Sequence, residues 1–460
     1  MPIPPHVFKG YDIRGLYPEE LNENNINVIV SAIYKFFKKG KPDNESLTLV
    51  VGTDMRTSSP SLTKKAIDTL VGLGAQVIDV GMVSTPTFYF AVDHYGYECG
   101  MQITASHNPQ QWNGVKFVKK GKNGLIKIGK STGMEEVKQM ALSGDVPKPQ
   151  PGGSVTKKEG VLEDEVENAL KIVGNPEIAK LKVVADPANA MGSQYIEALF
   201  KRVPQDLIRM NWELDGTFPA HQPDPLQLDT LVDLQKRVVS EKADLGLAPD
   251  GDGDRLFFID EKGNVVPPTI ITSIVTSELL KDNPGDTVYV DIRYLFTPRK
   301  IIEERGGKLQ VTKVGHAFIT EAMNDTGGIF AGESSAHYFF RATGNAESQM
   351  PVILTVLKVL TREGKQFSQV VEEYRRSYES GEFNFKVTNA PEILENLKGK
   401  YNDGQLETMD GVAITYPDWR FSVRTSNTEP LLRLNVEAYE KKQMEEKSDE
   451  LKSEIERIAK

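Results

Sequence analysis

The sequence predicts an α/β protein in which three tandem β-α-β-α-β domains with mainly parallel sheets precede a C-terminal α+β domain, around one central cleft. Three observations predict this: apolar strands that recur in a β-α-β-α-β order, polar loops at equivalent places in each repeat, and a last part with alternating strand patterns. Near-continuous apolar strands alternating with helices are typical of parallel sheets covered on both faces. The length of 460 residues also fits three or four domains of ordinary size.

Each repeat begins with an apolar strand that ends in an aspartate; these strands are residues 47–54, 181–186 and 287–291. Second and third strands follow helix-like stretches, at residues 75–80 and 100–104, 206–212 and 243–248, and 308–312 and 328–331. A Pro- and Gly-rich stretch at 147–153 is a candidate linker. The repeats predict domain I over residues 1–152, domain II over 153–260 and domain III over 261–378.

A polar loop follows the third strand of each repeat and returns into an extended segment. The loops are TASHNP (104–109), PDGDGD (249–254) and GESSAH (332–337). Ligands bind at the carboxyl ends of strands in open α/β sheets. One such loop is usually only a polar turn. Three equivalent loops indicate a function and predict that they share one cleft.

The last part of the chain has a different pattern. A charged helix is expected over residues 366–379, followed by alternating strands in EFNFKV and GVAITYPDWRFSV and by a final charged helix over 440–459. A hairpin tip carries RTSNT, residues 424–428. This pattern predicts an α+β domain IV over residues 379–460.

Composition excludes several classes of protein. Lys and Arg number 55 and Asp and Glu 65, so the formal net charge of −10 provides no overall field for nucleic acid or anionic lipid. No apolar run approaches the roughly 20 residues of a membrane helix, and the start MPIPPHVFKGYDIRG lacks the apolar core of a signal peptide. The single cysteine, Cys99, excludes an internal disulfide and a cysteine zinc site. We expect a cytoplasmic protein.

The PDGDGD loop predicts a metal site. Asp250, Asp252 and Asp254 alternate with glycines, which suits a hard-oxygen site for Mg²⁺ or Ca²⁺. An EF-hand is disfavoured although Glu261 lies at its twelfth position, because Arg255 replaces the required glycine and both flanks read as strands. A bare acidic turn is disfavoured because the three carboxylates would repel each other. Magnesium is favoured if a phosphate shares the metal.

Ser106 is the hydroxyl of the first loop. A serine hydrolase is disfavoured because the adjacent His107 is poorly placed and the chain has no G-x-S-x-G. A serine in a loop is most often a turn residue. The acidic loop and Lys116 instead favour a Ser106 that coordinates Mg²⁺ and carries a phosphoryl group.

The remaining candidates suit a sugar phosphate. Arginine offers a planar fork to phosphate, and hydroxyl groups and loop amides add donors. Carboxylates and serines can bind sugar hydroxyls, and histidine transfers protons near neutral pH. The sequence has no G-x-x-x-x-G-K-[ST], so nucleotide binding is unsupported. The predicted substrate-binding residues are Arg255, Arg293, His316, Glu333, Ser335, Arg424, Ser426, Asn427 and Thr428.

Four motifs in this order across the whole chain, TASHNPQQWNGVKF, PDGDGDR, GESSAH and RTSNTEP, resemble those of the α-D-phosphohexomutases. The start FKGYDIRG is similar to the phosphomannomutase/phosphoglucomutase branch, whereas the phosphoglucosamine mutase branch usually has a GTDGIRG-like start. GESSAH has serine and alanine where the first branch commonly has methionine and glycine. The following RATGNAESQMP lacks an Asp-Gly pair often present there. These departures leave the sugar preference open.

The resemblance implies a reversible interconversion of hexose 1-phosphate and hexose 6-phosphate, with mannose or glucose as the sugar. Ser106 is then the phosphoserine, a 1,6-bisphosphosugar is the intermediate and activator, and one Mg²⁺ per chain is held by Ser106 and the three aspartates. The resemblance gives catalytic roles to Lys116, Arg14 and His337, and binding of the phosphate that is not transferred to residues 424–428. Such enzymes are expected as monomers or homodimers.

Three other functions are compatible with the same motifs. A phosphoglucosamine mutase is the alternative enzyme, and a metal-dependent phosphatase is less favoured because a closed cleft suppresses hydrolysis. A non-catalytic sugar-phosphate-binding homologue is disfavoured because a binder needs no nucleophile. Reorientation of the intermediate requires domain IV to open, which predicts a hinge near residues 381–384.

Overall fold

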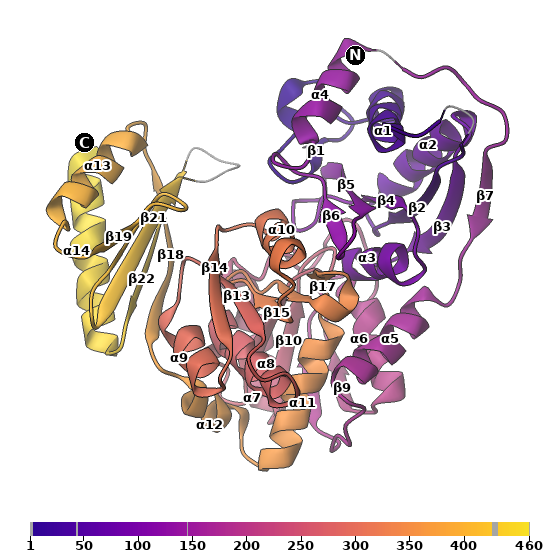
Figure 1. Cartoon of the computed structure of the whole chain (residues 1–460). Coiled ribbons are helices and arrows are strands. Elements are labelled where there is room, and N and C mark those ends of the chain that lie inside the picture. The colour runs from indigo at the N-terminus through magenta and orange to yellow at the C-terminus, as the bar shows by residue number, and fades with distance from the viewer. Residues whose placement is uncertain (1–2, 43–44, 145, 426–430, 460) are drawn as a thin grey trace. The chain divides into compact units, whose positions relative to one another are not determined.

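A computed structural model of the chain describes residues 3–42, 45–144, 146–425 and 431–459 (Figure 1). The chain forms two compact units. The first consists of Met1–Val266 with His337–Ser368, and the second of Pro267–Ala336 with Gln369–Lys460.

The first sheet has the strand order β1-β5-β4-β2-β3-β7, with β6 beside β5. Strand β2 is parallel to both β3 and β4, and β3 is parallel to β7. Strand β5 is antiparallel to both β4 and β1. The TASHNP loop is therefore the turn between two neighbouring antiparallel strands. The strands are β1 (Ile13–Leu16), β2 (Thr48–Thr53), β3 (Gln76–Met82), β4 (Cys99–Ile103), β5 (Trp112–Lys120), β6 (Leu125–Lys127) and β7 (Ser154–Lys157).

Helices cover both faces of the first sheet. Leu49 and Val51 of β2 belong to one core, with residues of α1, α2 and α4, whereas Val50 belongs to another with residues of α3. The alternation along β2 buries both faces and explains its continuous apolar sequence. The helical segments are η1 (Pro5–Val7), α1 (Glu23–Lys38), α2 (Ser59–Gly72), α3 (Thr85–His94) and α4 (Met134–Ser143).

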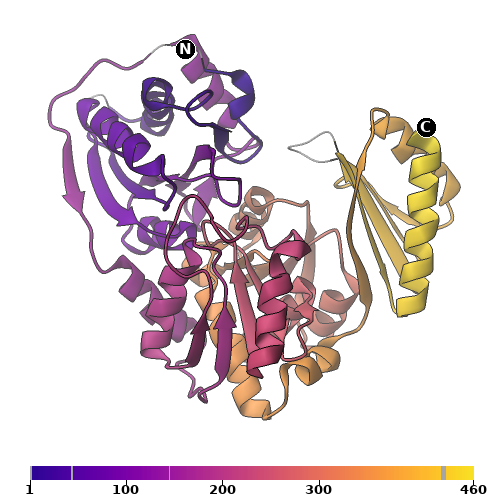
Figure 2. The same ribbon diagram turned by 180° about the vertical axis from the view of Figure 1, so that it is seen from behind.

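The second sheet has the order β12-β11-β10-β8-β9. β8 is parallel to β9 and β10, and β10 is antiparallel to β11, so the PDGDGD loop joins two neighbouring strands. Helix α7 packs on β8, β10 and β11 (Figure 2). The elements are α5 (Val161–Ile172), β8 (Lys182–Ala185), α6 (Gly192–Arg202), β9 (Asp206–Arg209), η2 (Leu228–Leu231), α7 (Val232–Glu241), β10 (Leu245–Pro249), β11 (Leu256–Asp260) and β12 (Val265–Val266).

The third repeat contributes to both compact units. In the second unit, β13 pairs in parallel with β14 and β15. In the first unit, β16 and β17 form an antiparallel hairpin, followed by α11. The elements are α8 (Pro268–Asp282), β13 (Thr287–Asp291), α9 (Phe296–Glu304), β14 (Lys308–Thr312), α10 (His316–Thr326), β15 (Phe330–Gly332), β16 (Tyr338–Phe340), η3 (Arg341–Thr343), β17 (Ala346–Glu347), α11 (Met350–Glu363) and α12 (Phe367–Tyr374).

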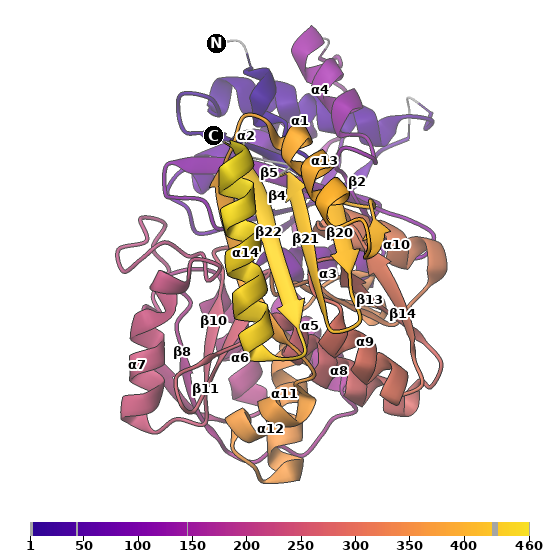
Figure 3. The same cartoon turned by 90° about the vertical axis from the view of Figure 1, so that its left-hand side faces the viewer.

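The C-terminal part is an antiparallel sheet in the order β18-β22-β21-β20-β19. Helices α13 and α14 cover one face of this sheet (Figure 3). Its core joins Phe421 and Val423 of β21 to Leu451 and Ile455 of α14. The elements are β18 (Tyr378–Lys386), α13 (Ala390–Lys400), β19 (Gln405–Glu407), β20 (Val412–Thr415), β21 (Trp419–Thr425), β22 (Leu431–Ala438) and α14 (Lys441–Ala459).

These elements confirm three α/β repeats followed by an α+β domain. The helix expected over 366–379 is wrong in extent: α12 ends at Tyr374, and β18 begins at Tyr378. Tertiary contacts explain the difference, because residues 378–386 pair with β22 and pack on the core of the C-terminal sheet. The domain boundaries stay predictions, although β7, which follows residue 152, pairs with β3 of the first sheet. Among the described residues, we find no helix with the length and apolarity to cross a membrane.

The buried Glu165 of α5 predicts how the stability of the folded protein depends on pH. Burial raises the pKa of its carboxyl from 4.5 to about 7, with a smaller opposing effect of Thr87. The folded protein therefore keeps a proton that the unfolded chain loses, and this group's contribution to stability falls as pH rises from 4.5 to about 7. We expect Glu165→Gln to be more stable than the parent at pH 8 by about 3 kcal/mol and equally stable at pH 4. Urea unfolding at both pH values measures this difference, and an equal difference at both would contradict it.

Candidate active site

The loop between β4 and β5 holds Ser106 in an unusual backbone conformation. Its φ is +52°, a region that few residues other than glycine adopt, and its side chain is buried. The amide N–H of Ser106 donates to Thr104 Oγ1 at 3.0 Å. Ser106 Oγ donates to Asp250 Oδ2 at 3.2 Å and lies 3.1 Å from His107 Nδ1. The fold therefore directs this hydroxyl at the acidic loop.

Arg56 holds this loop through hydrogen bonds to its backbone carbonyl groups. Its side chain is 0% exposed, and its Nε pairs with Asp54 Oδ2 at 3.2 Å. The guanidinium donates to the backbone carbonyls of Ser106, Asn108, Pro109 and Trp112 at 2.6–3.0 Å. Four carbonyl groups of one loop thus share a single cation, which fixes the loop's course.

The acidic loop between β10 and β11 approaches the serine loop closely. A Cβ on Gly251 would lie 2.3 Å from the carbonyl oxygen of Ser106, so only glycine fits there. Helix α3 also supports the acidic loop, since the Thr85 N–H donates to the Asp252 carbonyl at 2.9 Å and Thr85 Oγ1 donates to Asp252 Oδ2 at 2.6 Å. The two loops are therefore packed backbone to backbone.

Lys116 of β5 lies between two of the aspartates. Its Nζ is 2.6 Å from Asp252 Oδ2 and 2.6 Å from Asp254 Oδ2, and all three side chains are buried. Burial opposes the charge, but Asp252 and Asp254 hold the pKa of Lys116 well above its usual value. The ammonium group therefore stays charged beside the serine loop.

The three aspartates fit a divalent cation. A carboxylate oxygen from each of Asp250, Asp252 and Asp254 lies within 4.8 Å of the other two. Burial, followed by Asp254 and Asp252, raises the pKa of Asp250 well above its usual value. Asp252 Oδ1 is buried and has no hydrogen-bond partner among the described residues. Three clustered carboxylates, one with an unpartnered oxygen, match the hard-oxygen ligands that Mg²⁺ prefers.

The other predicted residues of this unit gather around the same loops. Arg14 of β1 pairs with Asp12 and donates to Asn108 Oδ1 in the serine loop. His337 Nε2 lies 3.3 Å from Asp254 Oδ1 and accepts from Arg255 Nε at 3.3 Å. The structure thus brings Ser106, Lys116, Arg255 and His337 close to the three aspartates and places Arg14 beside the serine loop, and the roles of these residues stay predictions.

His107 departs from the expectation that it is poorly placed. It lies within hydrogen-bond distance of Ser106 Oγ. Burial, followed by Arg255 and Arg14, holds the pKa of His107 well below its usual 6.5, so the ring is neutral. Because the Ser106 hydroxyl donates its single hydrogen to Asp250, a neutral ring that carries its hydrogen on Nδ1 can donate to Ser106 Oγ.

A second group of charged side chains lies in the second compact unit. Glu382 of β18 accepts from Arg424 Nη2 at 2.9 Å, pairs with Arg433 Nη1 at 3.2 Å and lies 3.9 Å from Arg293 Nη1. Arg293 also donates to Glu333 Oε1 at 3.3 Å. Three guanidinium groups therefore converge on one carboxylate, an arrangement that suits an anion with several oxygens.

Five other residues that the sequence predicts to bind substrate belong to this part of the chain. His316 begins α10, and the N–H of the preceding Gly315 donates to Glu333 Oε1 at 3.0 Å. Ser335 is buried two residues after Glu333. Ser426, Asn427 and Thr428 lie outside the described residues.

Sequence reasoning did not identify Arg56, Glu382 or Arg433. Arg56 carried a signal that could have been used, because Asp-x-Arg ends the first strand in two repeats, at 54–56 and 291–293. In both repeats the arginine Nε donates to that aspartate. Glu382 and Arg433 carried none, since a register shift in β18 between Glu379 and Glu382 brings them together.

Comparison with known proteins assigns this architecture to a family. Four family profiles match the chain in order: Phosphoglucomutase/phosphomannomutase alpha/beta/alpha domain I at residues 5–139, domain II at 164–263, domain III at 267–378 and the C-terminal domain at 382–453. The chain belongs to the phosphoglucomutase/phosphomannomutase family.

Relatives of this family align along nearly the whole chain. A phosphomannomutase of Escherichia coli is 34% identical over 94% of both chains, and one of Methanocaldococcus jannaschii is 35% identical over 98% of both. The crystal structure of a phosphoglucomutase/phosphomannomutase family protein from Burkholderia thailandensis superimposes with a TM-score of 0.88 at 27% identity, covering 99% of this chain and 98% of that one. The family resemblance inferred from the four motifs is thereby confirmed.

Proposed function

We infer that this protein is a phosphohexomutase that interconverts the 1- and 6-phosphates of a hexose. The observation that carries this function is the position of Ser106: a strained, buried serine whose Oγ faces an acidic loop and whose loop is held by one buried arginine. A non-catalytic binder needs no such nucleophile. Relatives named phosphomannomutase make mannose phosphates the first substrates to test, with glucose phosphates second.

Ser106 is proposed to carry the phosphoryl group. The P–O bond to Ser106 Oγ breaks as a bond forms to the free hydroxyl oxygen of the sugar monophosphate, which yields a hexose 1,6-bisphosphate. The bisphosphate then presents its other phosphoryl group, whose transfer regenerates phosphoserine and releases the isomeric monophosphate. A hexose 1,6-bisphosphate therefore also activates unphosphorylated enzyme. Catalysis depends mainly on position and on neutralised phosphate oxygens.

Asp250, Asp252, Asp254 and Ser106 are proposed to hold one Mg²⁺. Such an ion, when bound, neutralises charge on the phosphoryl oxygens. Lys116 and Arg14 supply fixed positive charge beside the serine loop. His337 is proposed to take the proton from the attacking hydroxyl, because an imidazole acts near neutral pH and this ring adjoins the acidic loop.

The group in the second compact unit is proposed to bind the rest of the substrate. Arg293 and Arg424 offer guanidinium forks to the phosphate that is not transferred, together with Ser426, Asn427 and Thr428. Glu333, Ser335 and His316 are proposed to contact sugar hydroxyls, and Arg255 to contact phosphate. Phosphoglucosamine mutase activity is not favoured. Cytoplasmic location and a monomeric or homodimeric state stay predictions.

Initial mutase rates test this function. Purified protein with Mg²⁺ and a trace of hexose 1,6-bisphosphate is assayed on mannose 1-phosphate, glucose 1-phosphate and glucosamine 6-phosphate. Turnover of either of the first two supports the proposal and identifies the preferred sugar. Turnover of glucosamine 6-phosphate alone, or binding of all three without turnover, would overturn it.

The metal site gives a separate prediction. Replacing Asp252 by Asn removes one charge from the triad and is expected to weaken Mg²⁺ binding at least tenfold, and to lower turnover by about 10²-fold or more. Calorimetric titration with Mg²⁺ alone measures binding, and EDTA is expected to abolish parent activity. Asp244→Asn, at an exposed aspartate just before β10, is the matched control and should change neither quantity. Unchanged Mg²⁺ affinity in Asp252→Asn would contradict the site.

A further inference from the structure

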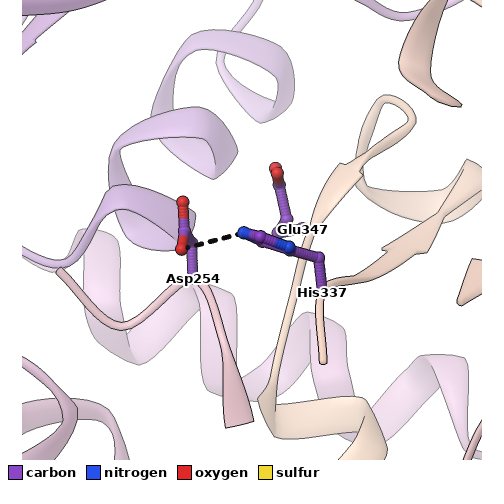
Figure 4. A group of neighbouring side chains, drawn as sticks. All are labelled: Asp254, His337 and Glu347. Atoms are coloured by element: carbon purple, nitrogen blue, oxygen red, sulfur yellow. Dashed lines mark ion pairs between the residues drawn. The ribbon is translucent and has the colours of Figure 1, made fainter. Parts of the chain in front are cut away.

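A buried trio of ionisable side chains links Asp254 of the acidic loop to the segment 337–347 (Figure 4). Asp254, His337 and Glu347 each place a carboxylate oxygen or ring nitrogen within 4.8 Å of the other two. Glu347 is 1% exposed and belongs to β17, where it faces Phe339 of β16. Because side chains alternate along a strand, the face that carries Phe339 is also the face of His337. The hairpin thus brings Glu347 beside the ring of His337.

Lys127 of the first sheet fixes Glu347. This lysine is 3% exposed, its Nζ forms an ion pair with Glu347 Oε2, and the same Nζ lies 4.8 Å from the ring centroid of Tyr89 and 4.9 Å from that of Phe339. A buried carboxylate is costly unless an opposite charge accompanies it. An aromatic cage around the ammonium adds cation–π attraction and leaves Lys127 little freedom to move.

Two further contacts tie the same hairpin to the same edge of the first sheet. The N–H of Leu125 donates to the Gly344 carbonyl at 2.8 Å, and Asn345 Nδ2 donates to the Asn123 carbonyl at 3.1 Å. Together with the Lys127–Glu347 pair, these bonds fix the β16–β17 hairpin against β6 and the segment before it. The residue before this hairpin is His337.

A second metal site is the competing explanation of the trio. Positive charge already accompanies each member: Lys127 pairs with Glu347, Lys116 with Asp254, and Arg255 Nε donates to His337. A further cation would have to displace or repel these groups. The trio is therefore better explained as a device that fixes the imidazole than as a second metal centre.

We propose that Glu347, held by Lys127, is a positioning residue that keeps the His337 ring against the acidic loop during phosphoryl transfer. The proposal rests on the proposed mutase function and on His337 as the proton acceptor. Proton transfer requires the ring nitrogen within hydrogen-bond reach of the attacking hydroxyl. A misplacement of about 1 Å can lower the rate by about 10²-fold.

A double-mutant cycle tests this role. We expect Glu347→Gln to lower kcat by about 10- to 100-fold while KM changes by less than about threefold. His337→Gln should lower kcat at least as much, and the combined variant should be no slower than His337→Gln alone, because Glu347 acts through that ring. Glu165→Gln, a buried carboxylate of the same unit that is not a member of the trio, is the control and should retain the parent kcat.

A second variant covers the case in which Glu347→Gln does not fold. Lys127→Met combined with Glu347→Gln removes both charges together, which leaves no unpaired buried charge and preserves stability. We expect this variant to melt near the parent temperature and to show the same loss of kcat. Parent kcat in this folded variant, or losses that multiply in the cycle with His337→Gln, would overturn the proposal. Failure of the mutase function itself would instead appear as no turnover by the parent protein.

Discussion

Ser106→Ala is expected to lower mutase turnover by at least about four orders of magnitude, because the variant has no oxygen to carry the phosphoryl group. Affinity for hexose phosphate should stay within a few-fold, since the guanidinium groups around Glu382 are untouched. Coupled assays give the rate, and calorimetric titration with mannose 1-phosphate gives the affinity.

Ser193→Ala is the matched control for this loss. Ser193 is a buried serine of the same compact unit, and its hydroxyl donates to the Ala190 carbonyl at 3.2 Å. Its removal should leave turnover unchanged. Parent turnover in Ser106→Ala would contradict the phosphoserine mechanism.

Arg56→Met is expected to have the second large effect, on both stability and rate. The variant leaves the buried Asp54 carboxylate and four loop carbonyls without their cationic donor. Loss of one member of a buried ion pair costs about 3–5 kcal/mol. The freed serine loop should also lower kcat by about 10²-fold. Calorimetric unfolding and mutase rates measure the two effects.

Arg209→Met controls for loss of an arginine. Arg209 is partly exposed and pairs with Glu197 at 2.8 Å on the surface. Its replacement should change stability by less than about 0.5 kcal/mol, because exposed ion pairs contribute little. An Arg56→Met protein with parent stability and parent kcat would show that the loop does not depend on this cation.

The main features of the fold and of the first site could be predicted from sequence. Strand β13 begins and ends at the predicted residues, because an apolar run that is buried on both faces has clear ends. Ser106, Lys116 and the three aspartates come together because the turn after β4 of the first sheet meets the turn after β10 of the second, with Lys116 on the strand that leaves the serine loop.

Other parts of the site depend on contacts that leave no pattern in the sequence. Arg56 binds carbonyl groups about 50 residues away, and any residue type can offer a carbonyl. Glu382 reaches its arginines through an irregularity in β18. Lys127 and Glu347, 220 positions apart, become partners only when the hairpin packs on β6. Packing between segments far apart in the chain decides such pairs, and the sequence around each residue does not indicate its partner.

Phosphopeptide mapping after incubation with a hexose 1,6-bisphosphate and Mg²⁺ tests the central claim most directly. We predict phosphate on Ser106 and its loss, with formation of a bisphosphate, when mannose 1-phosphate or glucose 1-phosphate is then added. An active enzyme whose Ser106 never carries phosphate, or whose phosphate does not pass to the sugar, would contradict the account.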